Sequence, residues 1–243
     1  MNLNRQQLER TLFLDVETVP GFSSLNHLPE EGQVLWKLKA SHLKTTSESD
    51  NEETLYKQRA GIYAEFGKII CISVGYLFFE NNNIVNARLK SFSGHDEKEV
   101  LSGFSQLLTQ YYNDPEKHLL CGHNLKEFDI PYICRRMLIH GIPLPSLLNI
   151  RGRKPWQIEY LLDTMEMWKF GDFKNYTSLR LLSHIFGIPS PKDDIEGSQV
   201  AEVYYQDNNL ERIVKYCEKD VLAVMMLILK WNHISMEGLM NDE

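Results

Sequence analysis

The 243-residue chain lacks long hydrophobic runs, paired cysteine motifs and internal repeats. No stretch approaches the ~18 apolar residues that a membrane-spanning helix requires, so we expect no membrane partner. The first ten residues, MNLNRQQLER, lack the apolar segment of a secretory signal peptide. These absences together predict a cytoplasmic protein.

Cysteines are few and widely spaced, and none of them forms a CxxC pair. All four lie in apolar segments, at positions 71, 121, 134 and 217. Disulfide frameworks and zinc sites have more regular cysteine spacing than this. We therefore expect reduced thiols in the core of an intracellular protein.

An excess of positive charge is also missing, because the formal net charge is −7. This balance argues against broad, non-specific coating of nucleic acid. It still allows the chain to bind one strand end through metal ions and a local basic patch. Candidates for such a patch are the RGRK run, with Arg151, Arg153 and Lys154, and the pair Arg135 and Arg136. Short basic clusters are more commonly solvated loops, so both interpretations stay open.

What is present resembles an ordinary globular protein, with 43% apolar and 24% charged residues. We expect a single domain over residues 1–243 with a helical insertion at about 20–66. The flanks of this insertion, 30–43 and 52–66, have helical character, whereas its middle is polar and expected to be mobile. The insertion has too few apolar residues to predict a core of its own.

Hydrophobic periodicity predicts strands and helices along the rest of the chain. The predicted strands cover residues 11–17, 68–79, 83–93, 118–124 and 160–164, with a hairpin turn at ENNN between the second and third. The predicted helices cover residues 96–114, 129–141, 178–188 and 209–231. This order predicts an α/β fold with a mixed sheet, antiparallel in its first three strands and parallel later, flanked by helices. Functional sites in such sheets lie at the carboxyl ends of strands.

The first predicted strand, in TLFLDVETVP, carries two acids where a buried strand should be apolar. Asp15 and Glu17 are two residues apart, so their side chains project in the same direction. Carboxylates held this close repel each other unless a proton or a cation separates them. Magnesium and manganese ions prefer such oxygen ligands. The pair alone is a weak pattern that often occurs by chance.

Two later segments carry further candidates. In GHNLKEFDIPYICRR, Asp129 stands just before a predicted helix, where it can equally be an N-cap, and Asn124 can be a turn residue. In YCEKD, Tyr216 and Asp220 are four residues apart on a helix and share a face. The alternative is the edge of an amphipathic helix, with a solvated aspartate and a half-buried tyrosine.

Together these segments resemble the DEDD (DnaQ-like) 3′–5′ exonucleases, in their DEDDy branch, which includes the proofreading domain of family B DNA polymerases. The matching stretches are LDVETVP, GHNLKEFDIPYICRRM and YCEKDVLAV, and LLDTMEM and NYTSLRLLSHIFGI are compatible. The resemblance spans nearly the whole chain except residues 20–66. It implies a ribonuclease H-like fold, and no polymerase module follows, so we expect a stand-alone relative.

The resemblance implies that two Mg²⁺ or Mn²⁺ ions, roughly 3.5–4 Å apart, support in-line hydrolysis of a phosphodiester. Asp15 would bridge both ions, Glu17 and Asp220 would complete the shell of the first, and Asp129 would support the second through water. Tyr216 would orient the attacking water, since an unperturbed tyrosine is a poor base at neutral pH. A related branch would have a histidine five residues before the last acid, where this chain has a lysine.

Weaker candidates for substrate contact are Thr18, Val19, Asn124, Phe128 and Lys174. Each has a structural alternative: strand exit for the first two, a turn for Asn124, core packing for Phe128 and a surface lysine for Lys174. Asp163, in LLDTMEM, is expected to be an N-cap or a supporting acid.

We expect the enzyme to release nucleoside 5′-monophosphates from the 3′ end of single-stranded DNA. RNA is the alternative substrate, because DEDD relatives also trim RNA and no residue here reads the 2′-hydroxyl group. A non-catalytic nucleic-acid-binding module of the same fold is the alternative from another class. The pathway, protein partners and oligomeric state are not predicted.

Overall fold

A five-stranded mixed sheet in the order β3-β2-β1-β4-β5 forms the centre of the structure. The computed structural model describes residues 3–44, 51–80, 85–172, 176–189 and 195–239. The strands are β1 (Thr11–Pro20), β2 (Gly67–Phe79), β3 (Val85–Ser93), β4 (Leu119–Gly122) and β5 (Leu161–Asp163). The α-helices are α1 (Arg5–Glu9), α2 (Glu30–Ala40), α3 (Glu52–Arg59), α4 (Glu97–Tyr111), α5 (Asp129–Ile139), α6 (Thr164–Lys169), α7 (Leu179–Phe186), α8 (Val200–Tyr205) and α9 (Leu210–Trp231).

The pairing of the strands confirms the predicted mixed α/β sheet. β1 pairs antiparallel with β2, and β2 pairs antiparallel with β3. β1 pairs parallel with β4, and β4 pairs parallel with β5. All five predicted strands exist, although the hairpin turn after Glu80 lies outside the described residues. Among the helices that the structure describes, none is long and apolar enough to cross a membrane.

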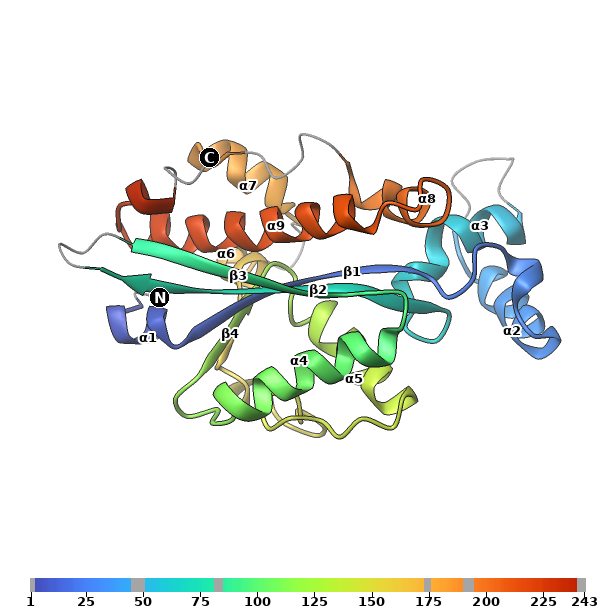
Figure 1. Ribbon diagram of the computed structural model, residues 1–243, viewed down its shortest axis with the longest axis horizontal. Helices are drawn as coiled ribbons and strands as arrows, with labels where there is room; N and C mark the ends of the chain where they lie inside the picture. Colours follow the sequence, from blue (N-terminus) through green and yellow to red (C-terminus); the bar gives the residue numbers. More distant parts are fainter. Residues whose placement is uncertain (1–2, 45–50, 81–84, 173–175, 190–194, 240–243) are drawn as a thin grey trace.

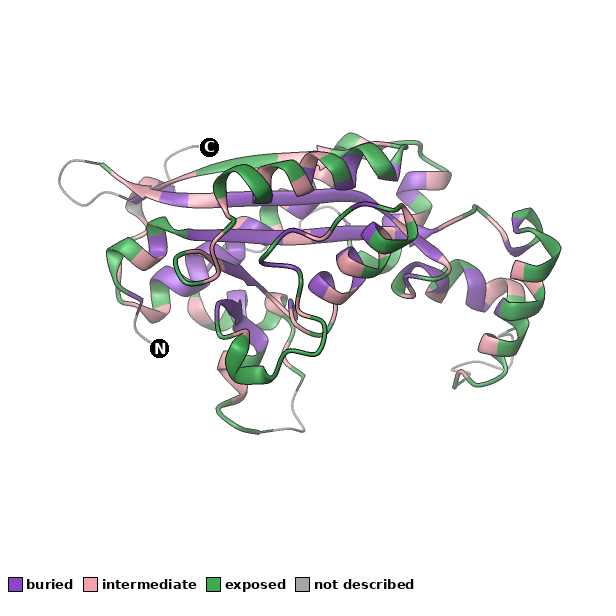
Figure 2. Ribbon diagram, turned by 90° about the horizontal axis from the view of Figure 1, so that it is seen from below, coloured by how far each residue is buried: buried purple, intermediate pink, exposed green. Residues whose placement is uncertain are grey.

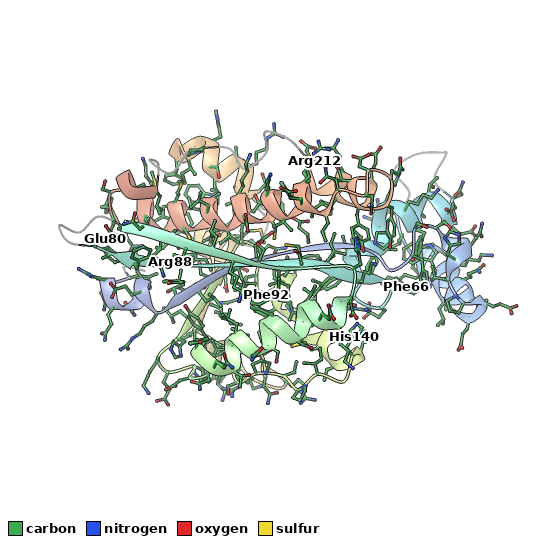
Figure 3. All side chains as sticks on the ribbon, in the orientation of Figure 1. Phe66, Glu80, Arg88, Phe92, His140 and Arg212 are labelled. Atoms are coloured by element: carbon green, nitrogen blue, oxygen red, sulfur yellow. The ribbon has the colours of Figure 1, made fainter. Side chains whose placement is uncertain are left out.

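Helices cover both faces of the sheet. α9 lies along one face, and α4 and α5 lie against the other (Figure 1). Figure 3 shows Arg212 on the α9 side, with Phe92 and His140 on the opposite side. The strands between these layers are largely buried, whereas the outward faces of the helices are exposed (Figure 2). The sheet is therefore the middle layer of the core.

The side chains of β1 alternate between two apolar clusters. Even-numbered residues such as Leu14 pack into the cluster beneath α4 and α5. Phe13 and Val19 point the other way, into clusters that include residues of α9. Asp15 and Glu17 share the direction of Phe13 and Val19, because they are separated from them by even numbers of residues. The two acids therefore interrupt an apolar strip that faces α9.

The segment 20–66 forms two helices and an apolar cluster of its own, which corrects the expectation that it is too poor in apolar residues. The ring of Trp36 lies 5.3 Å from that of Tyr56 and 5.1 Å from that of Phe66, measured between centroids. Leu25 and Leu55 are buried beside them. Three large aromatic rings compensate for the small number of apolar residues. The division of the chain into one domain with an insertion stays a prediction.

Candidate active site

The two acids of β1 lie close to a cysteine of α9. Asp15, Glu17 and Cys217 each offer one potential ligand atom, and these three atoms lie within 4.8 Å of one another. Glu17 is only 8% exposed, and Cys217 is fully buried. This gathering follows from the alternation of β1, which directs both carboxylates toward α9.

The other two predicted acids also lie within electrostatic range. Burial raises the pKa of Asp15 well above its usual value, and the negative charges of Asp220, Asp129 and Glu17 raise it further. A hydrogen bond from Cys217 opposes this shift. The fold thus brings the four acids of three sequence segments within electrostatic range of one another, and their role as metal ligands stays a prediction.

Asp129 begins α5 and is not its N-cap. The N-cap is Phe128, whose side chain makes no capping hydrogen bond, so the N-cap alternative for Asp129 is wrong. Asp129 is 3% exposed, and burial raises its pKa to about 8. Hydrogen bonds with its own backbone and that of Val16 lower this pKa, and the charges of Asp163 and Asp220 raise it. The helix therefore holds a carboxyl group against β1.

Tyr216 and Asp220 meet on the face of α9 that is turned to β1. Tyr216 is 6% exposed, so the alternative of a half-buried tyrosine at the edge of an amphipathic helix is wrong. Burial raises the pKa of Tyr216, as do the charges of Asp220, Glu17 and Asp15 and a hydrogen bond with Asp220. The phenol therefore stays protonated at neutral pH and can donate a hydrogen bond.

The donor set fits divalent cations that prefer oxygen. Four carboxyl groups repel one another, and this repulsion is relieved when a cation lies between them. Asn124, in the loop before α5, has a buried side-chain oxygen for which the described residues provide no hydrogen-bond partner, and its contact with a metal or substrate stays a prediction. The carboxyl groups of this chain therefore fit a divalent cation.

Cys217 is a site residue that sequence reasoning classed only as a core thiol. Its Sγ donates to Asp15 Oδ2 at 3.3 Å and to the Asp15 carbonyl oxygen at 3.4 Å. Cys217 lies three residues before Asp220 on the same helix, so its face was predictable from the spacing. The thiol chemistry was not, because buried cysteines are usually inert packing residues.

A chain of polar groups continues behind Cys217 along the α9 face of the sheet. Cys217 shares a hydrogen bond with Cys71, and Cys71 Sγ lies 3.5 Å from Ser73 Oγ. Ser73 Oγ lies 2.8 Å from Ser91 Oγ, which donates to Glu218 Oε1 at 2.6 Å. Asp15 is therefore supported by β2 and β3 as well as by α9.

The loop before α5 is fixed by Asp163. This residue caps α6, as one of the two expectations had it, by accepting hydrogen bonds from the next turn. It also accepts from Asn124 N at 3.0 Å and from Lys126 N at 2.9 Å. Asn124 has a positive φ of 63°, a conformation that asparagine tolerates better than most residues. The capping carboxylate thus sets the position from which Asp129 approaches β1.

The residues predicted to contact the substrate lie in different environments. Thr18 forms a side-chain hydrogen bond with Tyr132, and the side chain of Val19 is fully buried. The ring of Phe128 is half-buried and lies 5.4 Å from that of Tyr132, an arrangement that favours its packing role. Lys174 lies outside the described residues. These contacts remain predictions.

Arg136 belongs to a buried ion pair and not to a basic surface patch. Its guanidinium group binds the carboxylate of Glu97 through two nitrogens and donates to the carbonyl oxygen of Ala64 at 2.8 Å. His140 Nε2 lies 2.7 Å from the same carboxylate. Of the pair Arg135 and Arg136, only Arg135 is exposed.

Two archaeal DNA polymerases are similar to this chain. A DNA polymerase of Pyrococcus glycovorans is 23% identical over 213 residues, which cover 79% of this chain and 24% of the polymerase. The family B DNA polymerase of the hyperthermophilic archaeon Pyrobaculum calidifontis has a similar structure, with a TM-score of 0.54 and 14% identity over 91% of this chain and 24% of the polymerase. The structural likeness confirms the expected ribonuclease H-like fold.

Residues 62–243 match a family described as "Predicted 3'-5' exonuclease related to the exonuclease domain of PolB". The matched range includes Asp129, Tyr216 and Asp220. The matched range begins after β1 and does not include Asp15 and Glu17. The fold brings these two acids to the matched residues. The match covers well over half of the chain. The chain therefore belongs to this family of predicted 3′–5′ exonucleases related to the exonuclease domain of PolB.

Proposed function

We propose that the protein is a metal-dependent 3′–5′ exonuclease that releases nucleoside 5′-monophosphates from single-stranded DNA. The gathering of four acids from β1, α5 and α9 around Asp15 is the observation that carries this proposal. A cluster of acids that raises the pKa of its own members is costly for a fold, so its presence favours a function.

Asp15, Glu17, Asp129 and Asp220 would hold two Mg²⁺ or Mn²⁺ ions. When bound, such ions activate an attacking water and stabilise the leaving oxygen of a phosphodiester. Asp15 is central in this arrangement, because the charges of the three other acids all act on it. Cys217 holds one of its oxygens, so the carboxylate is oriented before a ligand arrives.

Tyr216 would orient the attacking water. Its pKa lies above the usual value for tyrosine, so the phenol is no general base near neutral pH. Its hydroxyl group can act as donor and acceptor, and Asp220, four residues further along α9, fixes its direction. This supports the role of Tyr216 as an orienting group.

Single-stranded DNA is the proposed substrate because both similar proteins are DNA polymerases. The family description supports a 3′ to 5′ direction. The segment 20–66 follows β1 directly and extends beyond its carboxyl end (Figure 1). At that position we propose that it restricts which nucleic acids reach the acids.

The test is digestion of 5′-labelled single-stranded DNA and RNA with Mg²⁺ or Mn²⁺. The wild type should produce a ladder that shortens from the 3′ end of DNA, and chelation should stop it. Asp15→Ala should shorten the strand at least ~10²-fold more slowly, the scale of loss for one preorganised electrostatic group. The exposed Glu9→Gln variant is the control and should match the wild type.

Equal shortening by Asp15→Ala, or none by the wild type, would contradict the catalytic assignment and favour a binding module. If the ladder forms on RNA alone, the substrate is RNA and not DNA. Melting curves of each variant separate a lost site from a lost fold.

A further inference from the structure

An exposed basic loop follows α5. Arg151, Arg153 and Lys154 are exposed in a protein of net charge −7. None of these three cations forms an ion pair with an acid in the described ranges. Trp156 follows them and is 68% exposed. Unpaired cations beside an exposed indole ring are a combination suited to a polyanion that also offers flat rings.

The same loop packs against α5 and brings a fourth cation into the surface. Cys134 Sγ donates to the carbonyl oxygen of Leu148 at 3.3 Å. Burial raises the pKa of Cys134 to about 11, and the positive charges of Arg135 and Arg151 both oppose this shift. Arg135 of α5 and Arg151 of the loop therefore both lie within electrostatic range of the Cys134 thiol. We call Arg135, Arg151, Arg153, Lys154 and Trp156 the basic loop surface.

α5 connects this surface to the acid cluster. The helix begins at Asp129, and Arg135 lies six residues further along. At 1.5 Å per residue, this separation is about 9 Å along the helix axis. A stacked strand advances about 3.4 Å per nucleotide, so the distance corresponds to roughly three nucleotides. A strand that follows α5 from a 3′ end at Asp129 therefore reaches the level of Arg135 only when it is longer than this.

We propose that the basic loop surface binds the single-stranded substrate on the 5′ side of the nucleotide being removed. The four cations contact backbone phosphates, and the ring of Trp156 stacks on a base. Neither contact reads the sequence, which suits an enzyme that shortens strands of any sequence. The proposal rests on the proposed function, and it adds a second contact region that short substrates do not use.

The first test measures binding without hydrolysis. Fluorescein-labelled dT20 is titrated at several salt concentrations with a protein that carries Asp15→Asn, and binding is followed by anisotropy. Adding R151Q, R153Q and K154Q removes three phosphate contacts, so the slope of log K against log[salt] should become shallower by about 2. The matched control adds R10Q, K98Q and K230Q, which remove the same charge from exposed positions elsewhere. Equal slopes for the two triple variants would overturn the proposal.

The second test uses the length of the substrate. In the active protein, the ratio of kcat/KM for dT20 to kcat/KM for dT3 should fall at least tenfold in the R151Q/R153Q/K154Q variant. The control triple variant should keep the ratio of the wild type. A fall of the same size in both triple variants, or in neither, would overturn the proposal.

The third measurement follows Trp156, the exposed member of the four tryptophans. Binding of dT20 should quench the intrinsic fluorescence, and Trp156→Leu should abolish most of the quenching. Unchanged quenching in Trp156→Leu would exclude stacking at this ring.

The proposed function and the basic loop surface can fail separately. If the protein binds dT20 through this surface but hydrolyses nothing, only the catalytic assignment is contradicted. If the protein hydrolyses dT20 but binds it equally well after the triple substitution, only the proposed role of the basic loop surface is contradicted.

Discussion

Asp15 lies where β1 would otherwise continue the apolar strip that packs on α9. Its carboxyl group is surrounded by three other acids, and a thiol donates a hydrogen bond to it. The proximity of the acids and Tyr216 could be predicted from the sequence because their side-chain types and order resemble those of the DEDDy exonucleases, and their roles stay predictions. Cys217 could not, because the sequence does not show that its thiol points at a carboxylate and not at methyl groups.

Cys217 should act as a positioning residue for Asp15. Cys217→Ala removes the donor, and we expect about tenfold more Mg²⁺ or Mn²⁺ for half-maximal activity, the lower end of effects seen when a supporting hydrogen bond is lost. Cys217→Ser keeps a donor and should stay near the wild type. The measurement is the initial rate against metal concentration.

The control for lost packing is Cys121→Ala, another fully buried cysteine that lies in the apolar cluster of Phe13. It should lower the melting temperature without changing the metal requirement. The positioning role is wrong if Cys121→Ala shifts the metal requirement as far as Cys217→Ala does.

At the scale of elements, the periodic segments were predictable and their ends were not. The first strand was expected to end at residue 17 but continues to Pro20, because residues 18–20 pair with the start of β2 after an irregularity in register. Such pairing is a tertiary contact that local sequence does not encode. The apolar cluster of segment 20–66 was missed for the same reason, since it depends on three rings meeting from separate segments.

One buried carboxylate joins several of these elements. Glu97, at the start of α4, accepts a hydrogen bond from Ile69 N of β2 at 2.7 Å and pairs with Arg136 and His140 of the α5 region. Burial alone would raise the pKa of Glu97, but the hydrogen bonds from Arg136, Ile69 and His140 outweigh it and leave this pKa below its ordinary value. The ion pair thus connects the sheet to the layer that carries Asp129.

Glu97→Gln should lower the free energy of unfolding at pH 7 by about 3–5 kcal/mol, because Arg136 is left charged and buried without its partner. The folded-state pKa is depressed, so the stabilisation is present above the unfolded value of about 4.5 and is lost as the pH falls through the folded pKa. The difference between wild type and variant should therefore shrink below about pH 4.5.

Urea unfolding between pH 3 and pH 8 measures this difference. Glu99→Gln, at an exposed position of the same helix, is the control and should cost little at any pH. A difference between Glu97→Gln and wild type that stays constant down to pH 3 would show that the ionised carboxylate is not what stabilises the fold.

For the whole molecule, the acid cluster means that repulsion between acids opposes folding when no metal is bound. The chain carries a net charge of −7, and four of its acids converge on one place. Cation binding should therefore stabilise the folded state much more than the unfolded chain, in which these acids are far apart.

Saturating Mg²⁺ or Mn²⁺ should raise the melting temperature by about 5–10 °C, which corresponds to a ligand present at ~100 times its Kd and a domain of this size. Asp15→Ala should melt higher than the wild type without metal, because it removes a carboxyl group whose ionisation is disfavoured by burial and by three neighbouring acids, and should gain little from metal. Differential scanning calorimetry measures both. A wild-type shift no larger than that given by NaCl of equal ionic strength would contradict the metal site.

The positions of β1 and α9 in the chain have a consequence for how the protein is made. Tyr216 and Asp220 are translated about 200 residues after Asp15. Their meeting closes a loop of about 200 residues, a contact of the kind that forms late in folding. A nascent or truncated chain that lacks α9 therefore contains three of the four acids and lacks Asp220 and Tyr216. The complete site can therefore form only after α9 has been translated.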